Sequence, residues 1–133
     1  MATPYLVESL KNDDRFVRWE SAKALVAIAD PEAATALVET LMDEDAGIRW
    51  LASEALIALG SAAIEPLLRG MIKNFDSSWF RQGSYHVLHV FEREHLLDTS
   101  TQKVLEALRS IEPEVSVPWV AEKALEELGK KTS

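Results

Sequence analysis

VRWESAKALVAIA, at residues 17–29, and IRWLASEALIALG, at residues 48–60, carry one pattern twice, 31 residues apart. Each starts with a β-branched residue, an arginine and a tryptophan, and Ala24-Leu25 recurs as Ala55-Leu56. A third version starts at Val117-Pro118-Trp119. Periods in this range are typical of repeat arrays, in which each unit buries its apolar face only against its neighbours. The sequence therefore predicts a stack of similar units.

Small and apolar side chains recur within these units at positions i, i+4, i+7, i+8 and i+11, the spacing of one face of an α-helix. The four stripes are Val17, Ser21, Ala24, Leu25 and Ile28; Ile48, Ala52, Ala55, Leu56 and Leu59; Phe80, Ser84, Val87, Leu88 and Phe91; and Val117, Ala121, Ala124, Leu125 and Leu128. No stretch shows the alternation of a strand. We predict an all-α fold, a right-handed α-α superhelix (solenoid) of about four antiparallel helix pairs. One domain is expected over residues 1–133, with repeats at about 3–29, 31–60, 62–93 and 101–129.

Prolines and glycines mark the expected helix ends. Pro4 and Pro31 suit a first helical turn, where the missing N–H of proline costs nothing, and Pro66 is expected to lie in the first turn of its helix or to bend it. Gly60 and Gly129 are expected to end helices. The expected helices cover about residues 3–11, 15–29, 31–42, 46–59, 62–73, 78–93, 101–110 and 116–128.

The order of residues within each unit resembles the short HEAT-like repeats first described in phycobilin lyases. The resemblance rests on an acidic residue, then Val-Arg or Ile-Arg, then Ala and Ala-Leu, at residues 14–25 and 45–56. The third unit keeps Phe80 and Arg81, whereas the fourth has Pro118 in place of the arginine. The resemblance implies a scaffold, a looser last junction, and arginines that pair with acidic groups between repeats: Asp14/Arg18, Asp45/Arg49 and Asp76/Arg81.

Composition argues against several classes of function. The formal net charge is −8, which disfavours binding to nucleic acid or to anionic lipid, because both need clustered Lys and Arg. The chain has no cysteine, so it has no disulfide framework and no Cys-based metal site. We find neither a signal peptide at the start of the sequence nor an uninterrupted apolar run that would span a membrane. We expect a cytoplasmic acidic protein with no nucleic-acid or membrane partner.

The second helix of each pair is expected to line the concave face of the superhelix, where its free positions would form rows. One row holds Trp19, Trp50, Gln82 and Trp119. The next holds Lys23, Glu54, His86 and Lys123, with Tyr85 at the edge of the two rows and His89 in a third. Tryptophan and tyrosine dominate protein interfaces, so these residues are the predicted partner-binding site. The alternative is that the tryptophans pack between helices, and Trp79, outside the row, is predicted to be structural.

No catalytic site or cofactor is predicted. His86, His89 and Glu92 lie three residues apart in turn, but Glu92 drifts around the helix, and solvated histidines are the preferred interpretation over a metal site. Deoxyhypusine hydroxylase has similar repeats but carries His-Glu after the arginine, and those histidines are missing here. The acidic run at residues 43–45 lacks the spacing of a calcium loop and is predicted to be a solvated turn.

The predicted function is therefore non-catalytic: a scaffold that binds a protein or peptide segment in its concave groove. The alternative is an accessory or lyase-like factor that holds a small planar cofactor in the same groove, since aromatic rows also suit a flat ring. A third hypothesis is an array that self-associates through this face. A monomer or a weak homo-oligomer is expected.

Overall fold

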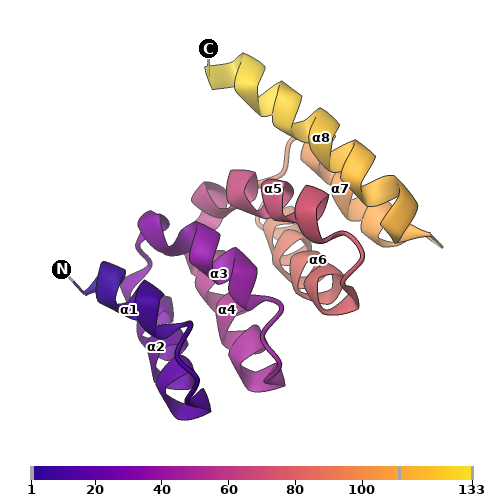
Figure 1. Ribbon diagram of the computed structural model, residues 1–133. Helices are drawn as coiled ribbons and strands as arrows, with labels where there is room; N and C mark the ends of the chain where they lie inside the picture. The colour runs from indigo at the N-terminus through magenta and orange to yellow at the C-terminus, as the bar shows by residue number, and fades with distance from the viewer. Residues whose placement is uncertain (1, 111, 133) are drawn as a thin grey trace.

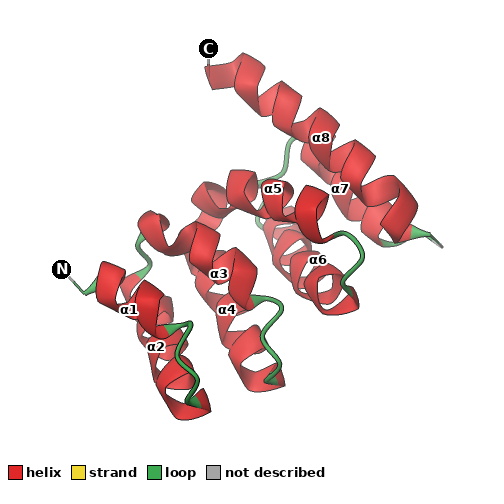
Figure 2. Ribbon diagram, viewed as in Figure 1, coloured by secondary structure: helices red, strands yellow, loops and turns green. Residues whose placement is uncertain are grey.

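The computed structural model describes residues 2–110 and 112–132, which contain helices and connecting turns and no strand (Figures 1 and 2). This confirms the all-α prediction. The elements are α1 (Thr3–Ser9), α2 (Arg15–Ile28), the 3-10 turn η1 (Pro31–Ala33), α3 (Ala34–Thr40), α4 (Ala46–Leu59), the 3-10 turn η2 (Gly60–Ala63), α5 (Ile64–Asn74), α6 (Ser78–Arg93), α7 (Thr99–Leu108) and α8 (Pro113–Thr132).

The helices form two rows, and the last pair enters them in reversed order. The helices α2, α4 and α6 pack in series, and α3 packs on α5 in the other row (Figure 1). In the last pair it is α7 that packs beside α6. Helix α8 packs on α5 and on α7 instead. One row is therefore α2, α4, α6 and α7, and α8 joins the row of α3 and α5. The prediction that every second helix lies on one face is wrong for α8.

Polar caps start the helices at the turns. Asp14 accepts a hydrogen bond from the Phe16 N–H, Asp45 from the Ile48 N–H, and Ser77 from the Phe80 N–H. These side chains satisfy N–H groups that have no partner within the helix. Asp45 also accepts a hydrogen bond from Arg15, the first cause of the lowered pKa of this carboxyl.

The apolar stripes form the core. In the second unit Ile48, Ala52, Ala55 and Leu56 are fully buried, and in the third unit all five stripe residues are fully buried. The first unit is more open, because no unit precedes α1 and α2 within the described residues, and Ile28 is 43% exposed. Gly70 lies in a tightly packed part of this core, since a Cβ atom there would lie 2.6 Å from Cζ of Phe80.

Helix ends agree with the sequence except near the C-terminus. Gly60 has a φ of 63° and caps α4, and Pro66 lies in the first turn of α5. Gly129 does not end α8, which runs on to Thr132 and starts earlier than expected, at Pro113. Pro118 lies within α8, where it removes one backbone N–H from the helical ladder.

One helical stretch, Ala46–Asn74, is long and apolar enough by length and composition to cross a membrane. It is made of α4, η2 and α5, and the positive φ of Gly60 interrupts it. Its apolar residues include Leu56 and Leu67, which are fully buried in the core. Core helices of soluble proteins have the same composition, so the stretch is weak support for a membrane span.

Candidate partner-binding groove

Three arginines occupy equivalent places and hold the preceding turn in the same way. Arg18 donates to the carbonyl oxygen of Asn12, Arg49 to that of Asp43, and Arg81 to that of Phe75. Each acceptor lies six residues before its arginine. The structural role expected of these arginines is therefore present: all three bind backbone carbonyls, and Arg18 also pairs with a junction carboxylate, that of Asp43. The expected pairs with Asp14, Asp45 and Asp76 do not form among the described residues, because the first two carboxylates cap helices.

The junction between α2 and α4 is closed. Nε of Arg18 lies 2.9 Å from a carboxylate oxygen of Asp43, and both side chains are about nine-tenths buried. This hydrogen bond is the main cause of the raised pKa of Arg18. The Trp19 ring lies directly against Gly47, where any larger side chain would collide with it. An ion pair and a packed ring therefore fill the space between these helices.

The junction between α4 and α6 is different because two residues have changed. Counted back from the arginine, Phe75 takes the place of Asp43, and Trp79 takes the place of Gly47. Arg49 accordingly lies over the Trp79 ring, with Cζ 4.1 Å from its centroid, a cation–π contact. Trp19 packs against Gly47, whereas the equivalent residue in the next unit is the large Trp79. Trp50 therefore cannot pack between the helices as Trp19 does.

Trp50 instead stacks on His86 of α6 and stays open to solvent. The ring centroids lie 4.9 Å apart with an interplanar angle of 28°, and Trp50 is 55% exposed. Nε2 of His86 is 3.6 Å from a carboxylate oxygen of Glu54, beyond hydrogen-bond reach, and this buried nitrogen has no hydrogen-bond partner in the described residues. The stack on Trp50 is therefore the main contact of the imidazole, and the Glu54 carboxylate lies nearby.

A cavity of about 330 Å³ opens at this junction. Its walls are Ala46, Arg49, Trp50, Ser53, Trp79, Gln82, Gly83 and His86. Two tryptophans and an imidazole therefore line a recess together with the buried hydroxyl of Ser53 and the exposed amide of Gln82. Apolar and aromatic walls with a few polar groups are the usual composition of a binding pocket.

A second cavity, of about 570 Å³, adjoins the first and shares Gln82 with it. It lies between α6 and the end of α7, and its walls are Ser78, Arg81, Gln82, Tyr85, Leu108 and Arg109. The guanidinium of Arg109 lies over the Tyr85 ring, 5.4 Å from its centroid, and its Nε donates to the Tyr85 hydroxyl at 3.3 Å. That hydrogen bond is the main cause of the raised pKa of Arg109. We call the two cavities together the α4–α6–α7 groove.

Glu92 and His89 hold Arg109 from the far side. Nη2 of Arg109 is 3.6 Å from a carboxylate oxygen of Glu92 and 3.4 Å from Nδ1 of His89, whose ring stacks on Tyr85. Glu92 also accepts a hydrogen bond from Gln102, the first cause of the lowered pKa of this carboxyl. The two histidines of α6 thus have different partners, and the described residues contain no cluster of three or more His, Asp or Glu that could hold a metal.

The structure brings together six of the ten predicted site residues. Glu54, Trp50, Gln82, Tyr85, His86 and His89 lie in or beside the groove. Trp19 and Lys23 lie on α2, at the closed junction. Trp119 and Lys123 lie on α8 in the other row, where Nζ of Lys123 is 5.7 Å from the Trp119 ring centroid. The predicted continuous row therefore breaks at its fourth member.

Sequence reasoning missed Trp79, Arg81 and Arg109 as walls of the groove. Trp79 was detectable, because aligning the units on their arginines places it at the position that Gly47 occupies in the second unit. Arg109 was not detectable, because it reaches the groove only through the reversed order of α7 and α8.

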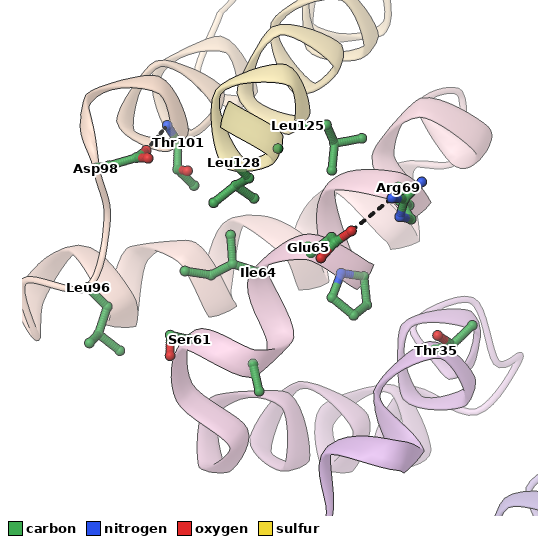
Figure 3. Close-up of a pocket in the computed structure, with 13 residues that line it drawn as sticks. Thr35, Ser61, Ile64, Glu65, Arg69, Leu96, Asp98, Thr101, Leu125 and Leu128 are labelled. Atoms are coloured by element: carbon green, nitrogen blue, oxygen red, sulfur yellow. Dashed lines mark hydrogen bonds and ion pairs between the residues drawn. The ribbon is translucent and has the colours of Figure 1, made fainter. Parts of the chain in front are cut away.

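A separate cavity of about 690 Å³ lies in the other row, where α8 covers the start of α5 (Figure 3). Ile64, Leu125 and Leu128 face it, and the ion pair between Glu65 and Arg69, 2.8 Å long, lies at its side. This cavity is a consequence of the reversed last pair and contains none of the predicted site residues.

The junction geometry is that of a stacked helical repeat, and comparison with known families agrees. Residues 1–57 match the family model of HEAT repeats. The match covers α1 to α3 and most of α4, and it confirms the resemblance to HEAT-like repeats. No curated protein matches the chain. HEAT repeats generally mediate protein–protein interactions and act as non-catalytic scaffolds.

Proposed function

We propose that this HEAT-repeat protein binds a segment of a partner protein in the α4–α6–α7 groove and catalyses no reaction. The observation that carries the proposal is the contrast between two equivalent junctions. Trp19 is packed against Gly47, whereas Trp50 is exposed beside a cavity walled by Trp79 and His86. A large aromatic side chain that is kept out of the core and placed at a recess suits recognition, because such residues supply most of the energy at interfaces.

The proposed mechanism has two parts. An apolar side chain of the partner enters the cavity between Trp50 and Trp79 and removes their rings from water. Gln82, His86 and Tyr85, at the rim, then set the register of the bound segment through polar contacts. Trp119 and Lys123 are left out of this site because α8 lies in the other row.

The array around the groove is proposed to be a right-handed superhelix of four antiparallel pairs, with repeats near residues 3–29, 31–60, 62–93 and 101–129. Its concave side is then the row of α2, α4, α6 and α7, the row that carries the groove. We further propose a cytoplasmic location and no nucleic-acid or membrane partner, in keeping with the net charge of −8 and the absence of cysteine.

A peptide-display selection tests this function. Random 12-residue peptides are selected on the immobilised parent protein and, in parallel, on the Trp50→Ala variant. The matched control is Trp119→Ala, which removes a tryptophan that is 64% exposed, against 55% for Trp50, but lies on α8. We expect the parent and W119A to enrich the same peptides and W50A to lose them. Enrichment that persists in W50A, or no enrichment on the parent, would contradict the proposal.

The alternative of a planar cofactor draws on the same cavity, since two indole rings and an imidazole could also hold a flat ring. It predicts absorbance beyond the tryptophan band in protein purified from its native source, lost in W50A. Self-association through this face predicts instead a solution mass that rises with concentration in the parent and not in W50A.

A further inference from the structure

The groove has an unexpected charge. The chain carries a net charge of −8, yet the walls of the two cavities include Arg49, Arg81 and Arg109 and no carboxylate. Two carboxylates beside the walls have partners of their own: Glu54 lies 3.6 Å from His86, and Glu92 contacts Gln102 and Arg109. A positive recess on an acidic protein is selective for an anionic group, because the rest of the surface repels it.

The first repeat shows what a junction arginine does with a carboxylate. Arg18 keeps one nitrogen on the preceding turn and offers its other two to Asp43 of the next unit, at 2.9 and 3.4 Å. This is the two-pronged geometry in which arginine recognises a carboxylate.

Arg81 is held on its preceding turn in the same way but meets no such acid. Its Nη1 donates to the carbonyl of Phe75 at 2.5 Å, and no ion pair of Arg81 forms among residues 2–110 and 112–130. The reason is topological: α7 replaces the expected helix beside α6, and the group that it brings to the cavity is another cation, Arg109. Arg81 and Arg109 thus line one recess together with the polar residues Ser78, Gln82 and Tyr85.

From this geometry we infer that the cavity of Arg81 and Arg109 binds a carboxylate of the partner, an Asp or Glu side chain two-pronged on Arg81 as Asp43 is on Arg18. The inference rests on the proposed function, since the same segment fills the Trp50–Trp79 cavity. Because the two cavities share Gln82, the apolar and the acidic side chains are neighbours in space. The partner segment therefore carries an apolar side chain close to an Asp or Glu, although the protein that binds it has a negative net charge itself.

The test uses the tightest peptide from the display selection on the parent, measured by fluorescence polarisation. We expect selected peptides to be enriched in Asp or Glu beside an apolar residue. Changing that acid to its amide should weaken binding about tenfold or more, the usual scale for a hydrogen-bonded charge pair. Arg109→Gln should weaken the acidic peptide similarly and leave its amide form unchanged. Arg69→Gln, on the other row and likewise paired with a glutamate, should change neither.

Arg81→Lys is the second variant. Lysine keeps a donor for the Phe75 carbonyl but lacks the two parallel N–H donors with which a guanidinium binds a carboxylate. This variant should fold as the parent does and lose most of the preference for the acid over its amide. Peptides enriched without acids, yet lost in W50A, would overturn the carboxylate site and leave the proposed function standing. No enrichment would overturn both. In a further peptide, phosphoserine replaces the acid. If this peptide binds more tightly than the original, the site is one for a phosphoryl group, and the inference of a carboxylate site is overturned.

Discussion

Removing the carboxylate of Asp43 should loosen the closed junction between α2 and α4. Asp43→Ala deprives Arg18 of its ion-pair partner while the guanidinium stays about nine-tenths buried. Breaking a buried ion pair by removing one partner typically costs about 3–5 kcal/mol. Arg18 keeps its bonds to the carbonyls of Asn12 and Asp13, and Glu44 lies 3.7 Å away and is exposed. We therefore expect a smaller loss, of about 2–3 kcal/mol.

Urea unfolding followed by circular dichroism measures this loss as a lower midpoint with an unchanged slope. In a domain of this size it corresponds to a melting temperature lower by about 6–12 °C. Asp43→Asn is the informative companion, because it keeps an acceptor for the Asp45 N–H, which Asp43 binds at 2.9 Å, and removes only the charge. The exposed pair of Glu65 and Arg69 is the control, and Glu65→Ala should cost less than about 1 kcal/mol.

A double-mutant cycle with Arg18→Met completes the test. If the ion pair holds the junction, R18M/D43A should be less destabilised than the sum of the two single changes, because no unpaired charge remains. If the free energies of unfolding of D43A and D43N both lie within about 0.5 kcal/mol of that of the parent, the reasoning is refuted.

Three further changes probe the packing and the electrostatics. Gly70→Ala should cost about 1–3 kcal/mol in urea unfolding, because its Cβ would lie 2.6 Å from Cζ of the buried Phe80; stabilisation, as helix propensity alone predicts, would contradict this. Ala29→Gly should stabilise by about 0.5–1 kcal/mol in the same assay, because Ala29 ends α2 with a φ of 51°, and a lower midpoint would contradict it. The hydrogen bond from Gln102 lowers the pKa of Glu92 in the folded state, so its contribution is present above the unfolded pKa and is lost as pH falls through the folded value. Glu92→Gln should therefore lose less stability than the parent between about pH 5 and pH 3, and parallel pH–stability curves would contradict this.

The helices themselves could be predicted because local rules determine them. The expected bounds of α4 and α6 agree with the structure, since Asp45 and Ser77 cap them and their apolar stripes are long. Ser77, not Asp76, takes the capping place that Asp45 has in the second unit, because the third unit is one residue longer before its arginine.

The placement of α8 could not be predicted from its stripe. Val117, Ala121 and Ala124 are buried as expected, but against α5 and α7. A stripe indicates that a helix face is covered and does not say which neighbour covers it. The connection after α6, where His95 has a φ of 60°, turns the chain so that α7 lies beside α6. Trp119 consequently lies outside the groove.

The groove was predictable in part. The repeating tryptophan position pointed to Trp50, which the structure places at a cavity, but the same rule treated Trp19 as equivalent. What separates them is the residue opposite, Gly47 for Trp19 and Trp79 for Trp50, which belongs to the next unit. The cavity thus depends on a pair of units, and a pattern within one unit cannot reveal it.

The four tryptophans allow one direct measurement of where the partner binds. Uniformly ¹⁵N-labelled protein shows one indole N–H resonance for each tryptophan, and these resonances are followed while a peptide from the display selection is added. We expect the signals of Trp50 and Trp79 to shift and to saturate together, while those of Trp19 and Trp119 stay in place. Shifts confined to Trp119, or to Trp19, would place the partner elsewhere and contradict binding in the α4–α6–α7 groove.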